Sequence, residues 1–175
     1  KLEPVRSSHV LAGSMILRMV ERGAVLVKKT AGTKVDLAFG DESSLEGLPQ
    51  CYSELWSMMK AASGADEILQ DKEFSRWSEK HCDRVDKWTR SVKRQGGDLL
   101  VAQNLMSRSG KFNDEGRAQA RKLLGIKKFL KDFTLVDERG SAEVGLWNDY
   151  LVFGTLFGIA DKVAKELHDI NPQVF

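Results

Sequence analysis

The sequence predicts a mainly α-helical fold with one small β-hairpin. Apolar residues recur at steps of three and four along most of the 175 residues, which is the spacing of one helix face. Only three prolines interrupt these runs. A single stretch, residues 24–39, has the two-residue alternation of a half-buried strand pair. Hydrophobic residues make up 42% of the chain and charged residues 30%, enough for a packed core.

The first elements resemble part of a winged helix. A helix should follow the N-cap serines Ser7 and Ser8 and end at Gly23. The hairpin comes next, with Gly32 in its turn. Its second strand should bury one face, formed by Val35, Leu37 and Phe39. Because a helix followed by a hairpin is how a winged helix ends, we expect a winged-helix-like module.

Two further helices should complete this module. Pro49 fits the first turn of one helix, which should end at residues 63–64. The second is a long amphipathic helix from about residue 72 to residue 94. We expect the glycine pair 96–97 to end it, and residues 99–102 to form one short strand.

Small polar residues without an apolar period occupy 104–113, and this stretch predicts a linker. Beyond it, Asn113 or Asp114 should cap a helix that continues to Phe133. A loop at 137–141 should precede a last helix, residues 142–167, bent or broken near Gly154 and Gly158. We therefore expect two domains: a winged-helix-like module with the long amphipathic helix at 1–105, and a helical C-terminal unit at 113–175.

Catalytic motifs are missing from the sequence. No serine lies in a Gly-x-Ser-x-Gly turn, and neither phosphate-binding glycine motif occurs. Cys51 and Cys82 match no metal spacing and indicate reduced thiols. His81 is interpreted as a core or core-edge histidine, not a ligand. We predict no catalytic residue, no cofactor and no metal, and keep an enzyme with an unrecognised site as the least favoured alternative.

Basic residues cluster on two of the predicted helices, while the net charge is only +2. The simplest interpretation places them on solvent-exposed faces. They also define a predicted surface for an anionic partner. Two such partners are considered, the phosphates of a nucleic acid and the head groups of anionic lipids, and nucleic acid is the less favoured. The residues of this surface are Arg84, Lys87, Arg90, Lys93, Arg94, Arg121 and Lys128.

The last third of the chain carries three motifs. They are Gly-Ile-Lys-Lys-Phe-Leu at 125–130, Trp-Asn-Asp-Tyr-Leu at 147–151, and Gly-Ile-Ala-Asp-Lys-Val-Ala at 158–164. Together they resemble the C-terminal region of the YciQ-like family, which are predicted bacterial membrane proteins of unknown function. The resemblance covers about 113–169 and extends weakly to 7–101. It departs at Val152, where the family usually has proline.

The resemblance implies a location and a role, but no catalytic residues. Members carry transmembrane helices, whereas the longest apolar stretch here, 151–160, is too short to span a bilayer. We therefore expect a membrane anchor outside these residues, and a position on the cytoplasmic face of the bacterial inner membrane. The predicted function is a non-catalytic cytoplasmic domain for protein interaction or assembly, with a partner surface at Trp147 and Tyr150. The alternative function is a nucleic-acid-binding winged helix.

Overall fold

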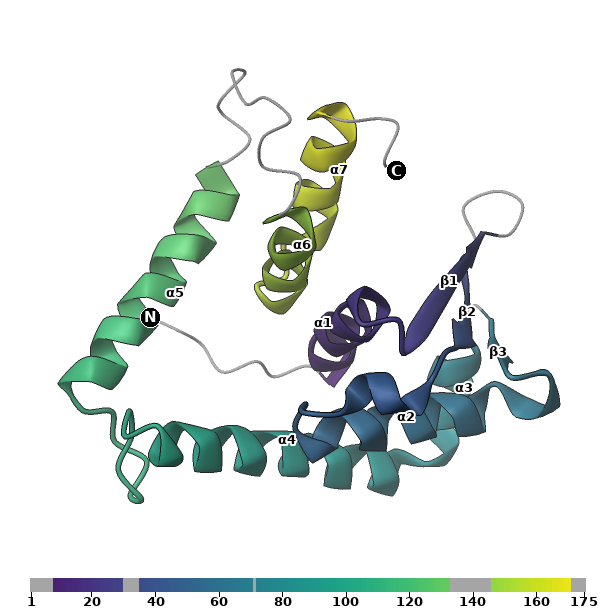
Figure 1. The fold of residues 1–175 in the computed structure, drawn as a ribbon, viewed down its shortest axis with the longest axis horizontal. Coiled ribbons are helices and arrows are strands. Elements are labelled where there is room, and N and C mark those ends of the chain that lie inside the picture. Colours follow the sequence, from purple (N-terminus) through teal and green to yellow (C-terminus); the bar gives the residue numbers. More distant parts are fainter. Residues whose placement is uncertain (1–7, 30–34, 71, 133–145, 171–175) are drawn as a thin grey trace. The chain divides into compact units, whose positions relative to one another are not determined.

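The computed structural model describes residues 8–29, 35–70, 72–132 and 146–170 (Figure 1). Within them, seven α-helices accompany one three-stranded antiparallel sheet, which confirms the predicted mainly α fold. The chain divides into two compact units. We call Arg18–Leu99 the sheet unit, and Lys1–Leu17 together with Leu100–Phe175 the helical unit.

The hairpin forms where the alternation predicts it. Helix α1 (Ser8–Glu21) ends before Gly23, whose φ of 77° requires glycine. Strand β1 (Val25–Lys29) then pairs with β2 (Val35–Phe39) in an antiparallel register that sets Val25 opposite Phe39. A third strand, β3 (Ile68–Leu69), joins the far side of β2. No finding tests the winged-helix assignment, which stays a prediction.

The burial predicted for the second strand is wrong at Val35 and at Ala38, whereas Leu37 and Phe39 are partly buried. Val35 is 51% exposed, whereas Ala38, expected on the outer face, is 8% exposed. Val35 lies beside the hairpin turn, and Phe39 at the other end of the strand packs edge-on against Trp56, with ring centroids 5.4 Å apart. Alternation gives the two faces of a strand, but the position of the neighbouring helix decides which residues are covered. On β1, Leu26 and Val27 are also about half exposed.

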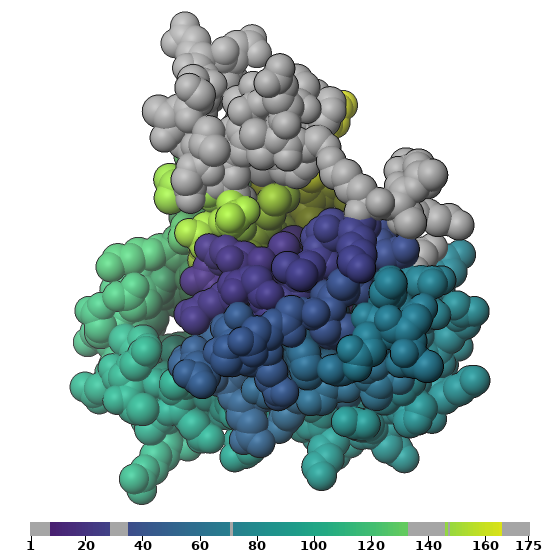
Figure 2. Space-filling model, turned by 45° about the vertical axis from the view of Figure 1, so that its right-hand side comes forward, coloured from purple at the N-terminus to yellow at the C-terminus, as the bar shows by residue number. Residues whose placement is uncertain are grey.

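Helix α2 (Gln50–Ala62) supports the sheet. Its Trp56 indole Nε1 donates a buried hydrogen bond of 2.9 Å to the Ala24 carbonyl oxygen, which also accepts from the Gly40 N–H. The 3-10 helix η1 (Glu42–Leu45) connects the strand to α2 and has Asp41 as its N-cap. Figure 2 shows η1 and α2, coloured blue, packed beside one another on the visible face.

The long amphipathic helix differs from its prediction at both ends. It is two helices, α3 (Glu73–Lys80) and α4 (Cys82–Ala102), separated by His81 with a φ of −125°. Apolar spacing misses this break because the periodic steps resume after one residue. Helix α4 also continues through the glycine pair 96–97, so the predicted stop there and the predicted strand at 99–102 are both wrong. Glycine lowers helix stability by only about 1 kcal/mol, which surrounding contacts can offset.

The helical unit contains α5 (Asp114–Asp132), α6 (Trp147–Leu156) and α7 (Ala160–Ile170). Leu130 and Val163, each 1% exposed, form its core, surrounded by a shell of partly buried side chains. That shell consists of Ile126, Phe129, Tyr150, Leu151, Phe153, Phe157 and Ile159. The predicted break near Gly158 is confirmed, since Gly158 has a φ of 70° between α6 and α7. The predicted loop at 137–141 and the first residues of the predicted last helix, 142–145, lie outside the described residues.

Residues 104–113, predicted as a linker, form a closed loop inside the helical unit. Met106 and Phe112 make an isolated antiparallel bridge, and the Asn113 side-chain nitrogen donates to the Asn104 carbonyl oxygen at 2.5 Å. The Asn113 side-chain oxygen accepts from the Gly116 N–H at 2.8 Å and so caps α5, as predicted. The chain passes from one compact unit to the other twice, at residues 17–18 inside α1 and at residues 99–100 inside α4. The predicted domains, 1–105 and 113–175, stay a prediction.

Among the described residues, no helix combines the length and the apolar character needed to cross a membrane.

Gly154 sets the approach of α6 and α7, and its substitution tests the packing. A Cβ at Gly154 would lie 3.0 Å from Cγ2 of Val163, so Gly154→Ala should destabilise the fold by about 1–3 kcal/mol. The matched change Gly96→Ala, at a helical position with open space, should stabilise it by about 0.5–1 kcal/mol. Urea unfolding of both variants measures this, and a Gly154→Ala variant as stable as Gly96→Ala would contradict it.

Candidate functional site

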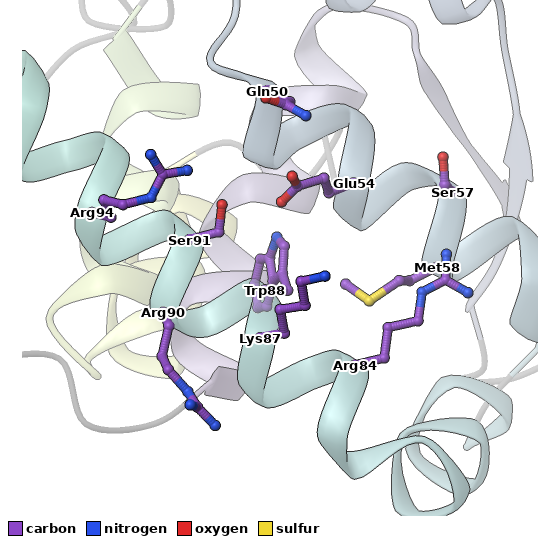
Figure 3. A pocket seen from close by; sticks show the side chains of 10 residues that line it. All are labelled: Gln50, Glu54, Ser57, Met58, Arg84, Lys87, Trp88, Arg90, Ser91 and Arg94. Carbon is purple, nitrogen blue, oxygen red and sulfur yellow. The ribbon is translucent and has the colours of Figure 1, made fainter.

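A groove of about 580 Å³ lies between α2 and α4 in the sheet unit (Figure 3). We call it the basic groove. Figure 3 shows the side chains of the two helices lining it, with Glu54 and Lys87 pointing into the space between them. Its lining residues are Gln50, Glu54, Ser57, Met58, Arg84, Lys87, Trp88, Arg90, Ser91 and Arg94.

Two hydrogen bonds to the peptide groups of one residue hold α4 against α2. Trp88 is 4% exposed, and its indole Nε1 donates to the Cys51 carbonyl oxygen at 2.9 Å. The Gln95 side-chain oxygen accepts from the Cys51 N–H at 3.2 Å. The N-cap of α2 is Pro49, which has no side-chain acceptor, and the first N–H groups of a helix lack intrahelical partners. Gln95 therefore acts as the cap from 44 residues away.

Two faces of helix α2 differ in what they contact. Leu55 and Met59 are fully buried on one face. On another, Gln50, Glu54 and Met58 recur every four residues and line the groove. The opposite wall follows the same rule, because Arg84, Trp88 and Ser91 lie at steps of four and three on α4. The groove is thus the place where two helix faces with helical periodicity meet.

Positive charge dominates the basic groove. Four cationic side chains line it, against the single carboxylate of Glu54. Arg94 makes only a long ion pair, 3.9 Å, with Asp98, and the Arg84 guanidinium lies over the Trp77 ring at 5.5 Å. Lys87 and Arg90 have no carboxylate oxygen within 4.0 Å in the part of the chain that the structure describes. The positive charge of this groove is therefore little neutralised by the protein.

The structure places the predicted basic residues in three locations. Arg84, Lys87, Arg90 and Arg94 line the basic groove. Lys93, on the same helix, is exposed and does not line it. Arg121 and Lys128 are exposed on α5, in the helical unit.

A second recess lies between α5 and α6 in the helical unit. We call it the apolar recess, and its volume is about 540 Å³. The predicted partner residue Tyr150 lines it and contacts Phe129, with ring centroids 5.8 Å apart. The side chain of Trp147 lies outside the described residues. The recess is lined by Lys122, Gly125, Ile126, Phe129, Leu146, Asp149, Tyr150 and Phe153.

The interpretation of His81 as a core-edge residue is wrong, because its side chain is exposed. The imidazole stacks on Trp77 at 4.2 Å, and its Nδ1 lies 2.8 Å from the Trp77 carbonyl oxygen. The following residue, Cys82, is exposed, while Cys51 is buried. Burial raises the pKa of the Cys51 thiol above its usual value. Within the described residues, no group of three His, Cys, Asp or Glu side chains could hold a metal ion.

Sequence reasoning found the α4 side of the groove and missed its α2 side. The four-residue spacing of Gln50, Glu54 and Met58 was a visible signal, but a mixed polar and apolar stripe is common on solvent faces. Gln95 carried no signal, because its partner, the backbone of Cys51, is distant in sequence.

The capping role of Gln95 predicts its effect on stability. Gln95→Ala should destabilise the fold by about 1 kcal/mol, because it leaves the Cys51 N–H without its acceptor. Lys93→Ala, an exposed position on the same helix, should change stability by less than about 0.5 kcal/mol. Thermal or urea unfolding compares the two variants, and equal effects would rule out the cap.

Residues 96–167 match a family described as the C-terminal domain of a predicted membrane protein (DUF2207). No curated protein and no solved structure matches the chain. The matched segment contains every residue of the apolar recess, while the residues of the basic groove precede it. Residues 96–167 are therefore similar to the C-terminal domain of a predicted membrane protein family of unknown function.

Proposed function

We propose that this chain is a non-catalytic domain of a bacterial membrane protein, that it lies at the cytoplasmic face of the inner membrane, and that it binds another protein. The similarity of residues 96–167 to the predicted membrane protein family is the observation that carries the proposal. The finer assignment to YciQ-like proteins, and a membrane anchor outside these residues, are parts of the same proposal.

The charge of the helical unit supports the cytoplasmic side. Cytoplasmic segments of membrane proteins are enriched in Lys and Arg, which also attract anionic head groups. Helix α5 carries six such residues, none of which has a carboxylate within 4.0 Å in the described residues except Arg117, paired with Asp114 at 2.6 Å. The six are Arg117, Arg121, Lys122, Lys127, Lys128 and Lys131.

The apolar recess supports protein binding. Its floor is aromatic and aliphatic, and Lys122 and Asp149 add charge to the lining. Leu146 lines the recess and is 48% exposed. Protein interfaces combine an apolar centre with a polar rim, and aromatic residues contribute most to their affinity. We infer that a partner protein inserts an apolar side chain between α5 and α6.

The nucleic-acid alternative rests on the same basic groove. Recognition helices present cations on a convex surface that enters the major groove of DNA. Here the cations border a recess between two helices, which favours a smaller ligand. An enzyme remains the least favoured proposal, because no described feature supports a reaction.

Membrane association is the first property to measure. After carbonate washing of membranes from the native host, the intact gene product should stay in the pellet, because an anchor outside these residues would hold it there. A known peripheral protein should be released in parallel. Recovery of the intact product in the soluble fraction would contradict the membrane proposal.

Cys82 allows the side of the membrane to be tested. It is exposed and Cys51 is buried, so a thiol-specific polyethylene glycol reagent should modify Cys82 selectively. We expect labelling in inverted vesicles and none in sealed right-side-out vesicles. The Cys82→Ser variant is the control for other thiols in the full-length protein. The opposite pattern of labelling would place the domain outside the cytoplasm.

The protein-binding proposal is tested at two exposed leucines. A photo-crosslinking amino acid at Leu146, in the recess, should capture a discrete partner in cells, because the side chain is exposed there. The same residue at Leu123, 38% exposed on α5 and outside the recess, is the matched control. Tyr150→Ala, in a chain that carries the crosslinking residue at Leu146, should abolish the Leu146 product. Equal products from both positions, or none from Leu146, would contradict a partner surface at the recess.

A further inference from the structure

The basic groove has a chemistry that the proposed protein-binding function does not use. It lies in the sheet unit, and its residues precede the segment with family similarity. Its walls are fixed by two hydrogen bonds, a buried one from the Trp88 indole to the Cys51 carbonyl oxygen and a partly buried one from the Cys51 N–H to the Gln95 side-chain oxygen, so the groove is preformed. A volume of about 580 Å³ is within the range of small-molecule sites.

The cations of the groove form a row along α4. Arg84 and Arg94 are ten residues apart, which corresponds to about 15 Å along a helix. Lys87 lies between them and points into the groove, whereas Arg90 contributes to the lining but its side chain points away from α2 in Figure 3. A row of this length suits a ligand with several negative charges rather than a single carboxylate. The arginine guanidinium binds phosphate through two parallel hydrogen bonds, which favours phosphate groups.

The remaining lining indicates an organic group beside the phosphates. Trp88 and Met58 form the apolar base of the groove from opposite helices, but they are only 4% and 1% exposed, so the methylene stems of the exposed Arg84 and Lys87 supply the apolar surface that a ligand can reach. Ser57, Ser91 and Gln50 supply neutral hydrogen-bonding groups. Inorganic phosphate would leave the apolar part of the groove unused, whereas a phosphorylated organic molecule would contact both the cations and the apolar part.

We propose that the basic groove between α2 and α4 binds a phosphorylated organic ligand carrying two or more phosphate charges. Arg84, Lys87 and Arg94 contact the phosphates, and the organic part packs on the methylene stems of Arg84 and Lys87. The Glu54 carboxylate repels the phosphates of the ligand and lowers its affinity. The same phosphate chemistry occurs in soluble nucleotides and in anionic phospholipid head groups, and the experiment separates these two sources.

The binding test compares charge-matched variants of the intact chain. ADP and inorganic pyrophosphate are titrated by calorimetry at low and physiological salt, and vesicles of phosphatidylcholine with or without phosphatidylglycerol are used for sedimentation. The groove variant Lys87→Gln/Arg94→Gln should weaken binding by at least about tenfold, because two charge-assisted contacts are lost. The control variant Lys80→Gln/Lys93→Gln removes the same charge from exposed positions outside the groove and should bind normally.

Glu54 supplies a test in the opposite direction. Glu54→Gln should strengthen binding several-fold, because it removes the only carboxylate of the lining. Glu79→Gln, exposed on α3, should leave the affinity unchanged. Circular dichroism of each variant shows that the fold is retained.

Each outcome decides the proposal. ADP binding that depends on Lys87 and Arg94 supports it and identifies a soluble ligand. Vesicle binding with the same dependence, and without ADP binding, supports it and identifies a lipid head group. Equal losses in the groove and control variants, binding of none of these probes, or binding of pyrophosphate without binding of ADP or vesicles would overturn it. None of these results bears on membrane anchoring or on the Leu146 crosslink, so the two proposals fail separately.

Discussion

The sheet unit depends on the peptide groups that flank the Cα of Cys51. Both polar atoms of this residue's backbone, the N–H and the carbonyl oxygen, bind side chains of α4. The two side chains, Trp88 and Gln95, lie seven residues apart, which is about 10 Å along the helix. Two separated attachments fix both the distance and the direction of one helix against another. The opposed walls of the basic groove exist because α4 cannot turn about either contact alone.

Two tryptophans extend this arrangement to the sheet. Trp56 donates to the Ala24 carbonyl oxygen before β1, and Trp88 donates to Cys51 in α2. Each indole is almost fully buried, and each has its one donor satisfied by backbone. A buried indole without an acceptor would lose the hydrogen bond that water supplies. The pair therefore connects hairpin, α2 and α4 through contacts that are both apolar and directional.

Sequence periodicity predicted the helices and the hairpin. The glycines at which helices were predicted to end or break include Gly23 and Gly158, and both have a positive φ. The same reasoning failed at the glycine pair 96–97, because these residues remain helical and the cost of glycine is small beside tertiary contacts. The break at His81 had no signal in the apolar spacing. Boundaries of this kind depend on contacts distant in sequence.

The candidate site was predictable only in part for the same reason. The row of cations on α4 could be read from its own helical spacing, but the spacing says only that they share a face. The groove exists because α2 packs opposite this face. The residues that α2 contributes are Gln50, Glu54 and Met58. The apolar recess was indicated by Tyr150, yet its other wall comes from α5, more than twenty residues earlier in the chain.

The reactivity of the Cys51 thiol also reports on the contact between α2 and α4. Its thiol is 5% exposed, whereas Cys82, at the start of α4, is open to solvent. A reagent can reach Cys51 only when the first turn of α2 separates from its surroundings. The ratio of the two labelling rates therefore reports the equilibrium constant for that local opening, as amide exchange does for a single hydrogen bond. The chain thus contains its own reporter of how tightly the groove walls are held, with its own exposed reference.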